Sequence, residues 1–145
     1  MLFRSLVQTN DPESELIELA SAQDYDSFFD TEIATRRLMV YPPYCDLVQV
    51  ALTADSMQAA KTAAAEFFDR LKAALSEQPE IKIIVLGPSP ASVVKVSLKY
   101  RFRLILKVKN TARFRALMQL GLQEFYQSAG KNVSVTVDIN PENII

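Results

Sequence analysis

The chain has 145 residues, carries a formal net charge of −1 and is 49% hydrophobic, which suffices for one domain with a full core and a helical appendage. It contains no histidine, one cysteine and three glycines, so histidine-based catalysis, histidine or multi-cysteine metal sites and glycine-rich phosphate-binding loops are excluded. The lone Cys45, and the lack of a secretion signal or a long apolar run, lead us to expect a cytoplasmic protein with no membrane partner.

The first 44 residues are predicted to form a short strand followed by two helices. The strand covers residues 2–8. The first helix is capped by Asp11, begins at Pro12 and runs to about residue 22, because aspartate and proline are favoured at these positions. The second helix covers about residues 24–40, where apolar residues recur at helical spacing. Tyr41-Pro42-Pro43 ends it, since a residue that precedes proline avoids the helical region.

Charged residues in the second helix fit its polarity. Acidic residues cluster in its first half, Arg36 and Arg37 lie near its end, and Glu32 stands four residues before Arg36. Acids near a helix N-terminus, cations near its C-terminus and a glutamate four residues before a cation are all stabilising. We therefore interpret Arg36 and Arg37 mainly as structural residues.

From residue 45 onward, the predicted order is strand, helix, strand, strand, helix, strand. Asp55 is expected to cap the first of these helices, Gly87-Pro88 and Pro90 to end the second strand, and Gly130 to end the last helix. The order implies an α+β fold: a four-stranded, mainly antiparallel sheet with two helices on one face, preceded by a helical N-terminal segment. The elements cover residues 46–53, 56–76, 81–86, 92–108 (interrupted near Ser97), 111–128 and 133–139.

The stretch between Glu80 and Glu124 is strongly basic and contains no acidic residue. Without its nine positive charges, the rest of the chain would carry a net charge of −10. A basic stripe of this density is typical of a protein that binds a phosphate backbone, and the plain alternative is a lysine-rich surface that faces only water. The nine residues are Lys82, Lys95, Lys99, Arg101, Arg103, Lys107, Lys109, Arg113 and Arg115.

Apolar and basic side chains alternate over residues 99–109. Because successive side chains of a strand point to opposite faces, the apolar set is predicted to lie under the helices and the basic set on the open side of the sheet. Neighbouring cations repel each other, and the acidic remainder of the fold, a protein partner or a polyanion would relieve this. The predicted contacts to DNA phosphates are Lys95, Lys99, Arg101, Arg103, Lys107 and Lys109.

Arg113 and Arg115 are DNA-contact candidates of second rank. They lie near the start of the last predicted helix, where a cation opposes the helix dipole, so they either form a phosphate site or point into water. The aromatic residues of the basic strand, Tyr100 and Phe102, are predicted to face the core. This argues against base stacking on the sheet and favours contact with the nucleic-acid backbone.

Four motifs occur in the order Glu32-x-x-x-Arg36-Arg37-x-x-x-Tyr41-Pro42-Pro43, Gly87-Pro88-x-Pro90, Tyr100-Arg101-Phe102 and Asp138-x-x-Pro141. In this order they resemble the C-terminal region of the primosomal replication-restart helicases, the PriA family. The opening LVQTNDPES also resembles the exit from the family's second helicase lobe, so the resemblance covers essentially the whole chain. The chain departs from the family at Ser97-Leu98-Lys99, where a glycine often precedes the tyrosine-arginine pair.

The resemblance implies that the chain is the C-terminal piece of an ATP-driven 3′-to-5′ helicase that acts at stalled or recombination-derived forks and reloads the replicative helicase. Residues 1–44 would be the end of a helicase lobe with connecting helices, and residues 45–145 a DNA-binding domain that packs on the helicase core. ATPase motifs and zinc-binding cysteines lie upstream in the family, so no cofactor and no enzyme activity are expected in this chain itself. The implied partners are forked or single-stranded DNA, the helicase core and the single-stranded-DNA-binding protein.

Two alternatives stay open at this point. In the first, the same basic face docks on an acidic surface of the helicase core or on an acidic partner tail. In the second, the domain binds a small regulatory molecule or mediates oligomerisation, since this order of elements serves many such domains. An enzyme is the weakest hypothesis, because no spacing supports Lys95, Tyr100 and Asp138 as an acid–base set.

Overall fold

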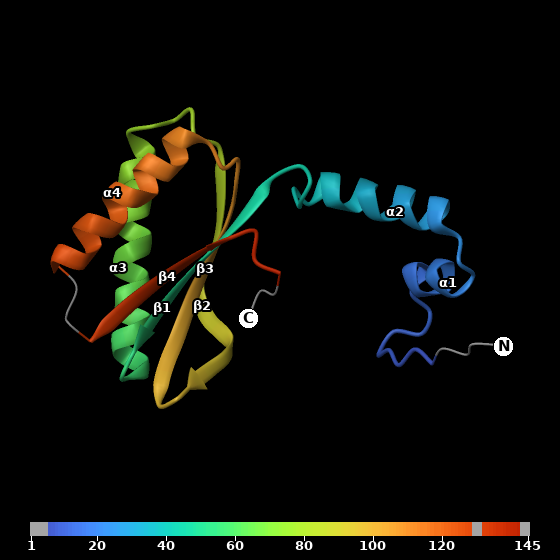
Figure 1. Ribbon diagram of the computed structural model, residues 1–145, viewed down its shortest axis with the longest axis horizontal. Helices are drawn as coiled ribbons and strands as arrows, with labels where there is room; N and C mark the ends of the chain where they lie inside the picture. The colour runs from blue at the N-terminus through green and yellow to red at the C-terminus, as the bar shows by residue number, and fades with distance from the viewer. Residues whose placement is uncertain (1–5, 129–131, 143–145) are drawn as a thin grey trace. The chain divides into compact units, whose positions relative to one another are not determined.

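The structure is a computed structural model that describes residues 6–128 and 132–142 (Figure 1). The chain forms two compact units, Met1–Val40 and Tyr41–Ile145. The described part of the first unit contains two helices, and the second unit combines a four-stranded sheet with two helices. The predicted α+β fold with a helical N-terminal segment is therefore confirmed. The division into domains at residues 1–44 and 45–145 stays a prediction.

The first unit contains helices α1 (Glu15–Ser21) and α2 (Tyr25–Leu38). α1 begins later than predicted, after Ser14, because Asp11 belongs to a preceding turn in which its carbonyl accepts a hydrogen bond from the Ser14 N–H at 3.3 Å. Asp11 is thus not the helix cap. The predicted strand at residues 2–8 is wrong for residues 6–8, which form no strand, and residues 2–5 lie outside the described part.

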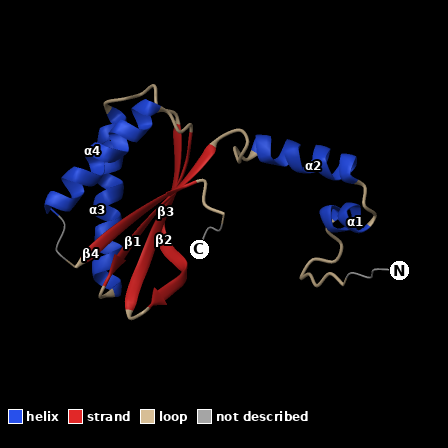
Figure 2. Ribbon diagram, in the orientation of Figure 1, coloured by secondary structure: helices blue, strands red, loops and turns tan. Residues whose placement is uncertain are grey.

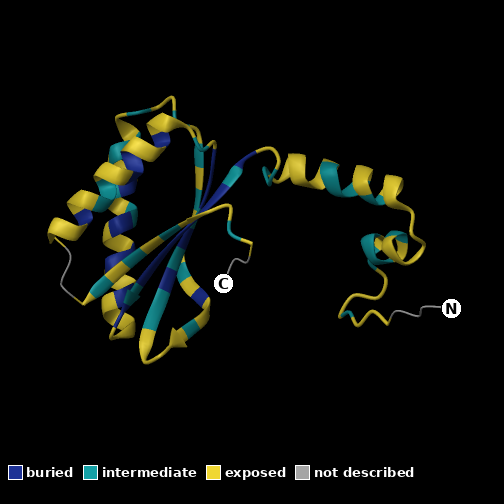
Figure 3. Cartoon of the chain, in the orientation of Figure 1, coloured by how far each residue is buried: buried dark blue, intermediate teal, exposed yellow. Residues whose placement is uncertain are grey.

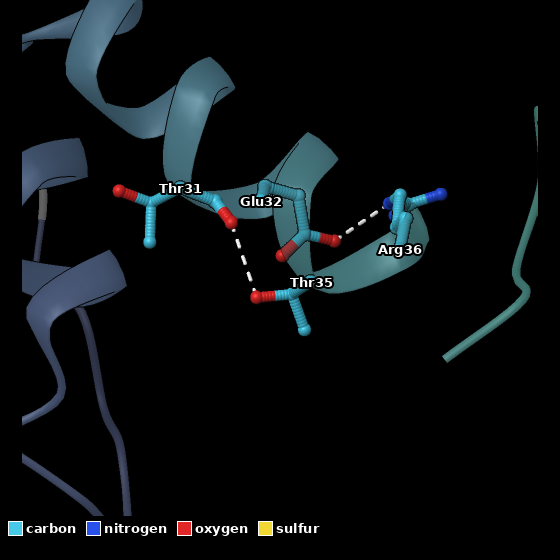
Figure 4. A network of polar contacts seen from close by, with 4 residues as sticks. All are labelled: Thr31, Glu32, Thr35 and Arg36. Atoms are coloured by element: carbon cyan, nitrogen blue, oxygen red, sulfur yellow. Dashed lines mark hydrogen bonds and ion pairs between the residues drawn. The ribbon is translucent and has the colours of Figure 1, made fainter. Parts of the chain in front are cut away.

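The charge pattern of α2 acts as predicted. The Asp24 side chain caps the helix, and the Arg36 Nε lies 2.7 Å from the Glu32 Oε1 (Figure 4). The helix ends at Leu38, two residues before the predicted end, because Val40 has φ +52°, outside the right-handed helical region. In the described part of this unit, neither helix contains a buried residue (Figure 3).

The second unit holds the sheet. Its strands lie in the order β2-β3-β1-β4, and every neighbouring pair is antiparallel. The helices α3 and α4 lie on the same face of the sheet (Figure 2). We call the opposite face, whose side chains point away from α3 and α4, the open face. The elements are β1 (Asp46–Ala54), α3 (Met57–Ser76), β2 (Ile83–Val96), β3 (Lys99–Val108), α4 (Ala112–Ser128) and β4 (Val133–Ile139).

The hydrophobic core lies between the sheet and these two helices. Alternation along β1 and β3 places every second residue there, as predicted. Burying one leucine or phenylalanine side chain contributes about 1.5–3 kcal/mol, so this cluster holds the unit together. Met57, the first residue of α3, is 49% exposed, although its spacing fits the apolar stripe of that helix. The largest fully buried side chains are Phe114, Phe125, Leu52, Leu104, Leu106, Val48 and Val50.

The caps of α3 and α4 come from hydroxyl side chains. The Ser56 hydroxyl accepts a hydrogen bond from the Ala59 N–H at 3.1 Å, so Ser56, and not Asp55 as predicted, caps α3. Asp55 instead lies 3.4 Å from the Lys99 ammonium. Thr111 accepts a hydrogen bond from an N–H in the first turn of α4 at 3.2 Å. The predicted helix end at Gly130 lies outside the described residues.

β2 continues through the Gly87–Pro90 segment, so the predicted break there is wrong. Its register against β3 shifts twice, before Ser89 and again after Pro90. Bulges at an edge strand accommodate proline, which has no N–H to donate to a neighbouring strand. Gly87 has φ +103°, and a Cβ at this position would lie 2.8 Å from the Arg103 carbonyl oxygen, so only glycine fits.

The predicted interruption near Ser97 is the turn of a hairpin. Ser97 and Leu98 form the two-residue connection between β2 and β3, and Val96 pairs with Lys99 across it. Both turn residues have positive φ, +48° and +68° respectively. This is the backbone of the tight turns that suit the twist of neighbouring strands.

Candidate nucleic-acid interface

The open face carries the basic side chains of β3. Phe102, Leu104 and Leu106 are buried on the core side, which leaves the residues between them on the open face, as predicted. Successive residues on one face of a strand are about 7 Å apart. The open-face residues of β3 are Lys99, Arg101, Arg103, Ile105 and Lys107.

Lys99, Arg101 and Arg103 form what we call the basic row. On the neighbouring β1, the uncharged Thr53 pairs with Arg101 and the uncharged Ala51 with Arg103. Lys99 has Asp55 at 3.4 Å, but both side chains are more than half exposed. An ion pair this exposed contributes about 0–1 kcal/mol. The row therefore concentrates three positive charges on one face of β3.

Lys107 lies on the same face but is buried. It is 8% exposed, and its Nζ lies 3.6 Å from the centre of the Tyr41 ring. A cation over an aromatic face is stabilised by the ring quadrupole. We call this contact the tyrosine strap, since Tyr41 starts the second unit and covers the end of the basic strand. Sequence reasoning missed the strap because its two residues are 66 positions apart.

Lys95 and Lys109 lie away from the basic row. Lys95 pairs with Tyr100 across the hairpin, and its Nζ lies 5.1 Å from the centre of that ring. Cross-strand partners share a face, so Lys95 lies on the side of the hairpin opposite to Lys99 and Arg101. Lys109 is exposed just after the end of β3.

Arg113 and Arg115 have neighbours of their own near the start of α4. Arg113 forms an ion pair with Glu80 at 2.6 Å. Arg115 donates to the Asn110 carbonyl at 3.1 Å and to its side-chain oxygen at 3.3 Å. Both arginines are exposed, and these contacts relieve part of their opposition to the helix dipole.

The rest of the open face is mostly uncharged. Ile84 and Leu86 of β2, each 45% exposed, pair with Lys107 and Ile105 of β3. Gln49 of β1 is 8% exposed, and its Oε1 has no hydrogen-bond partner among the described residues. The face therefore combines a basic row near the hairpin with an apolar area near the other end of β3.

Two polar side chains fasten the ends of three strands. Asp46 at the start of β1 accepts a hydrogen bond from the Asn140 amide at 2.9 Å and one from the Asn110 N–H at 2.8 Å. These hydrogen bonds hold the pKa of the Asp46 carboxyl below its usual value. Asn140 in turn accepts from the Leu47 N–H at 2.9 Å. The Asp138-x-x-Pro141 motif thus contributes Asn140 to what we call the strand clasp.

Cys45, next to the clasp, is buried. Burial raises the pKa of its thiol, while the nearby Lys107 opposes this rise. A thiol in such surroundings is unreactive at neutral pH. Cys45 therefore serves as a small buried residue near Lys107.

An apolar groove of about 440 Å³ lies between α4 and the edge strand β4. Phe114, Met118 and Leu122 form its helix side, and Val137 and Ile139 its strand side. Nearby, the Tyr126 hydroxyl donates to the Val135 carbonyl at 3.0 Å and accepts from the Val135 N–H at 3.1 Å. The hydroxyl thereby satisfies backbone groups on the outer edge of β4.

Comparisons with known proteins show which family this domain belongs to. The family described as "Primosomal protein N C-terminal domain" matches residues 37–142, which include the sheet, both of its helices, the tyrosine strap and the strand clasp. The chain belongs to this family. The predicted resemblance is therefore confirmed, and this primosomal C-terminal domain is the part of the chain that carries the basic row.

Curated relatives match the primosomal domain and the residues before it. The replication restart protein PriA of Bacillus subtilis is 29% identical over 94% of this chain. The probable replication restart protein PriA of Deinococcus radiodurans is 31% identical over 86% of this chain. The chain spans 16% and 12% of the length of these two relatives, respectively.

Two features are absent from the described residues. None of their helices is both long and apolar enough to cross a membrane. Histidine, cysteine, aspartate and glutamate side chains do not gather there in groups of three or more that could hold a metal ion.

Proposed function

We propose that this primosomal domain binds the DNA backbone at forks without reading the base sequence. The basic row supports this most directly, because its three cations lie about 7 Å apart on the open face, and the β1 partners of Arg101 and Arg103 are uncharged. Such a row attracts phosphates, and contacts to phosphates position a protein on DNA but carry no sequence information. The aromatic residues of β3 face the core, which leaves few stacking partners on the sheet itself.

The eight predicted contact residues differ in how well they are placed to contact DNA phosphates from the open face. Lys99, Arg101 and Arg103 are the primary candidates, because they share one face. Three further cations could extend the row of phosphate contacts, which we call the phosphate track. They are exposed at the far end of β3 and the start of α4: Lys109, Arg113 and Arg115. Lys95 lies on the other side of the hairpin, and Lys107 lies under Tyr41, so both would contribute less to a track on the open face.

We further propose that the chain works as part of a longer replication restart protein, as the names of its relatives suggest, and that this protein is a cytoplasmic helicase. In this proposal, residues 1–44 connect the domain to a helicase lobe, and the domain packs on the helicase core. ATP and zinc would bind in the upstream part of that protein. DNA and the single-stranded-DNA-binding protein would be its partners.

The test is fluorescence anisotropy of the 145-residue chain with forked, duplex and single-stranded DNA at about 50–200 mM salt. Three phosphate contacts predict a slope of log K against log salt of about −2 for single-stranded DNA. The Arg101→Glu/Arg103→Glu variant should lose binding to all three DNAs.

The matched control is Lys61→Glu/Lys72→Glu, which makes the same change of charge on exposed positions of α3. This control should keep most of its binding, since α3 lies on the other side of the sheet. Equal losses in both variants would mean that total charge, and not the basic row, governs binding. No binding of the wild-type chain at about 50 mM salt would refute the proposal for this chain.

A second candidate function is docking on another protein surface. The observation in its favour is the apolar end of the open face, where Ile84 and Leu86 are each 45% exposed beside Lys107. Apolar residues next to cations suit a partner that is both apolar and acidic. Replacing both residues with serine should then weaken binding to the helicase core and leave DNA affinity unchanged.

A further inference from the structure

The tip of the β2–β3 hairpin has a residue that turn chemistry does not explain. Leu98 has φ +68°, a conformation that favours glycine or asparagine in two-residue turns. A leucine in this conformation is sterically strained. Because Leu98 is 79% exposed, packing against other residues offsets little of this strain. The position thus carries a large apolar side chain at the apex where both backbone geometry and solvent disfavour it.

The surroundings of Leu98 are apolar at the apex and basic on both sides. Val96, next to the turn, is 43% exposed. Lys99 and Arg101 lie on the open face, whereas Lys95 lies on the opposite face over the Tyr100 ring. The hairpin therefore presents a short apolar edge with cations on each of its two faces.

We propose that Leu98 is an apolar wedge that contacts the terminal base pair where a DNA duplex opens into two single strands. One strand would pass over the Lys99 and Arg101 side of the hairpin, and the other over the Lys95 side. This inference rests on the proposed DNA-binding function and adds to it the structure of DNA that the domain prefers.

Three physical arguments support this partner. Leucine side chains of DNA-bending proteins insert between base steps and unstack them, so the chemistry of the residue fits. A base pair at the end of a duplex is stacked on one side only, so a wedge unstacks it at a lower cost than it would open a continuous stack. The strands that diverge from it carry phosphates on both sides, which matches cations on both faces of the hairpin.

A wedge also lets the domain distinguish forked DNA from a duplex, which the basic row cannot do. Phosphate contacts are similar in duplex, fork and single strand and do not distinguish the junction. An apex that touches the last base pair requires a junction or a duplex end. A blunt duplex lacks the two diverging strands and should be bound less tightly than a fork.

The test uses anisotropy with a fork, a blunt duplex of the same length and a single strand, for wild type and Leu98→Gly. Glycine adopts positive φ freely, so the variant should melt no lower than wild type. Its affinity for the single strand should be unchanged. Its preference for the fork over the duplex should fall about tenfold, the factor that burying one leucine side chain supports.

A second readout reports the contact itself. A fork with 2-aminopurine in the last base pair should become brighter when wild type binds, because this base fluoresces more strongly when it is unstacked. Leu98→Gly should bind without this increase. Leu120→Ala, which removes another exposed leucine from the surface of α4, should behave as wild type in both assays.

The outcomes separate the two proposals. If wild type binds no DNA, the proposed function fails, and the wedge fails with it. If wild type binds but Leu98→Gly retains its fork preference and the fluorescence increase, the wedge is refuted and backbone binding stands. If Leu98→Gly melts lower than expected, Leu98→Asn, which also suits positive φ, replaces it in the same two assays.

Discussion

Asp46 and Asn140 stand 94 residues apart in the chain, yet the Asn140 Nδ2 donates to the Asp46 Oδ1 at 2.9 Å. The same asparagine exchanges two further hydrogen bonds with Leu47, accepting from its N–H at 2.9 Å and donating its own N–H to the Leu47 carbonyl at 2.7 Å. The strand clasp thus closes the sheet at the end opposite the hairpin. It joins the start of β1 to the segment that follows β4.

We expect Asn140→Gly to destabilise the chain by about 1–3 kcal/mol, because it leaves the part-buried Leu47 N–H and one Asp46 oxygen without a partner. Asn140 has φ +53°, which glycine adopts easily, so the variant isolates the loss of the side chain. Urea denaturation measures the change. Gln127→Ala on the exposed side of α4 is the control, and an equal effect there would argue against the clasp.

The clasp also predicts a dependence of stability on pH. The pKa of Asp46 is lowered in the folded chain by its hydrogen bonds to Asn140 and to the Asn110 N–H. Its contribution is therefore fully present above the ordinary aspartate pKa of 3.8 and is lost as the pH falls through the lowered, folded-state value. Urea denaturation between pH 7 and pH 3 should show a smaller decline for Asp46→Asn than for wild type. Parallel declines would show that other carboxyl groups dominate acid unfolding.

Two glycines offer a matched pair of substitutions. Gly87→Ala should destabilise the chain by more than about 1 kcal/mol, since Gly87 has φ +103° and the new methyl group would meet the Arg103 carbonyl oxygen. Gly121→Ala should stabilise it by about 0.5–1 kcal/mol, because the residue lies within α4 and, apart from its chain neighbours and the nearby backbone of its own helix, no atom of the described residues lies within 4 Å of the added carbon. Thermal melting of both variants checks the opposite signs. A neutral Gly87→Ala would mean that the bulge can rearrange.

The tyrosine strap is testable by a double-mutant cycle. Tyr41→Leu and Lys107→Met each remove the cation–ring contact, which is worth about 1–2 kcal/mol when partly desolvated. Combining them should cost less than the sum of the single changes by that amount. Tyr41→Phe keeps the ring and should be nearly neutral. Strict additivity in urea denaturation would show that the two residues do not interact.

The alternation of side chains made much of this domain predictable. In a strand, residue type decides the face, so the burial of Phe102, Leu104 and Leu106 and the exposure of the basic row could be predicted without coordinates. The same reasoning predicted the order of elements and hence the fold class. Local chemistry was less reliable at helix starts. Asp55 and Ser56 both suit a cap, and only the structure shows that Ser56 accepts the Ala59 N–H while Asp55 lies beside Lys99.

Proline misled the prediction of β2 for a physical reason. Pro88 and Pro90 read as strand breakers, because proline cannot donate to a ladder of hydrogen bonds. In the sheet order, however, β2 is an edge strand, and its register shifts absorb both prolines. An edge position is a property of the whole sheet and is not visible in a local pattern.

The sequence by itself determined the class of the fold, the core face of each central strand and the concentration of positive charge on β3, because these follow from periodicity along one segment. Only the tertiary structure decided which cations share a surface. It placed Lys95 on the face of the hairpin opposite to Lys99, and it put Tyr41 over Lys107 and Asn140 against Asp46. The last two contacts join residues that are distant in the chain. The packing of the complete sheet, and no local preference, brings them together.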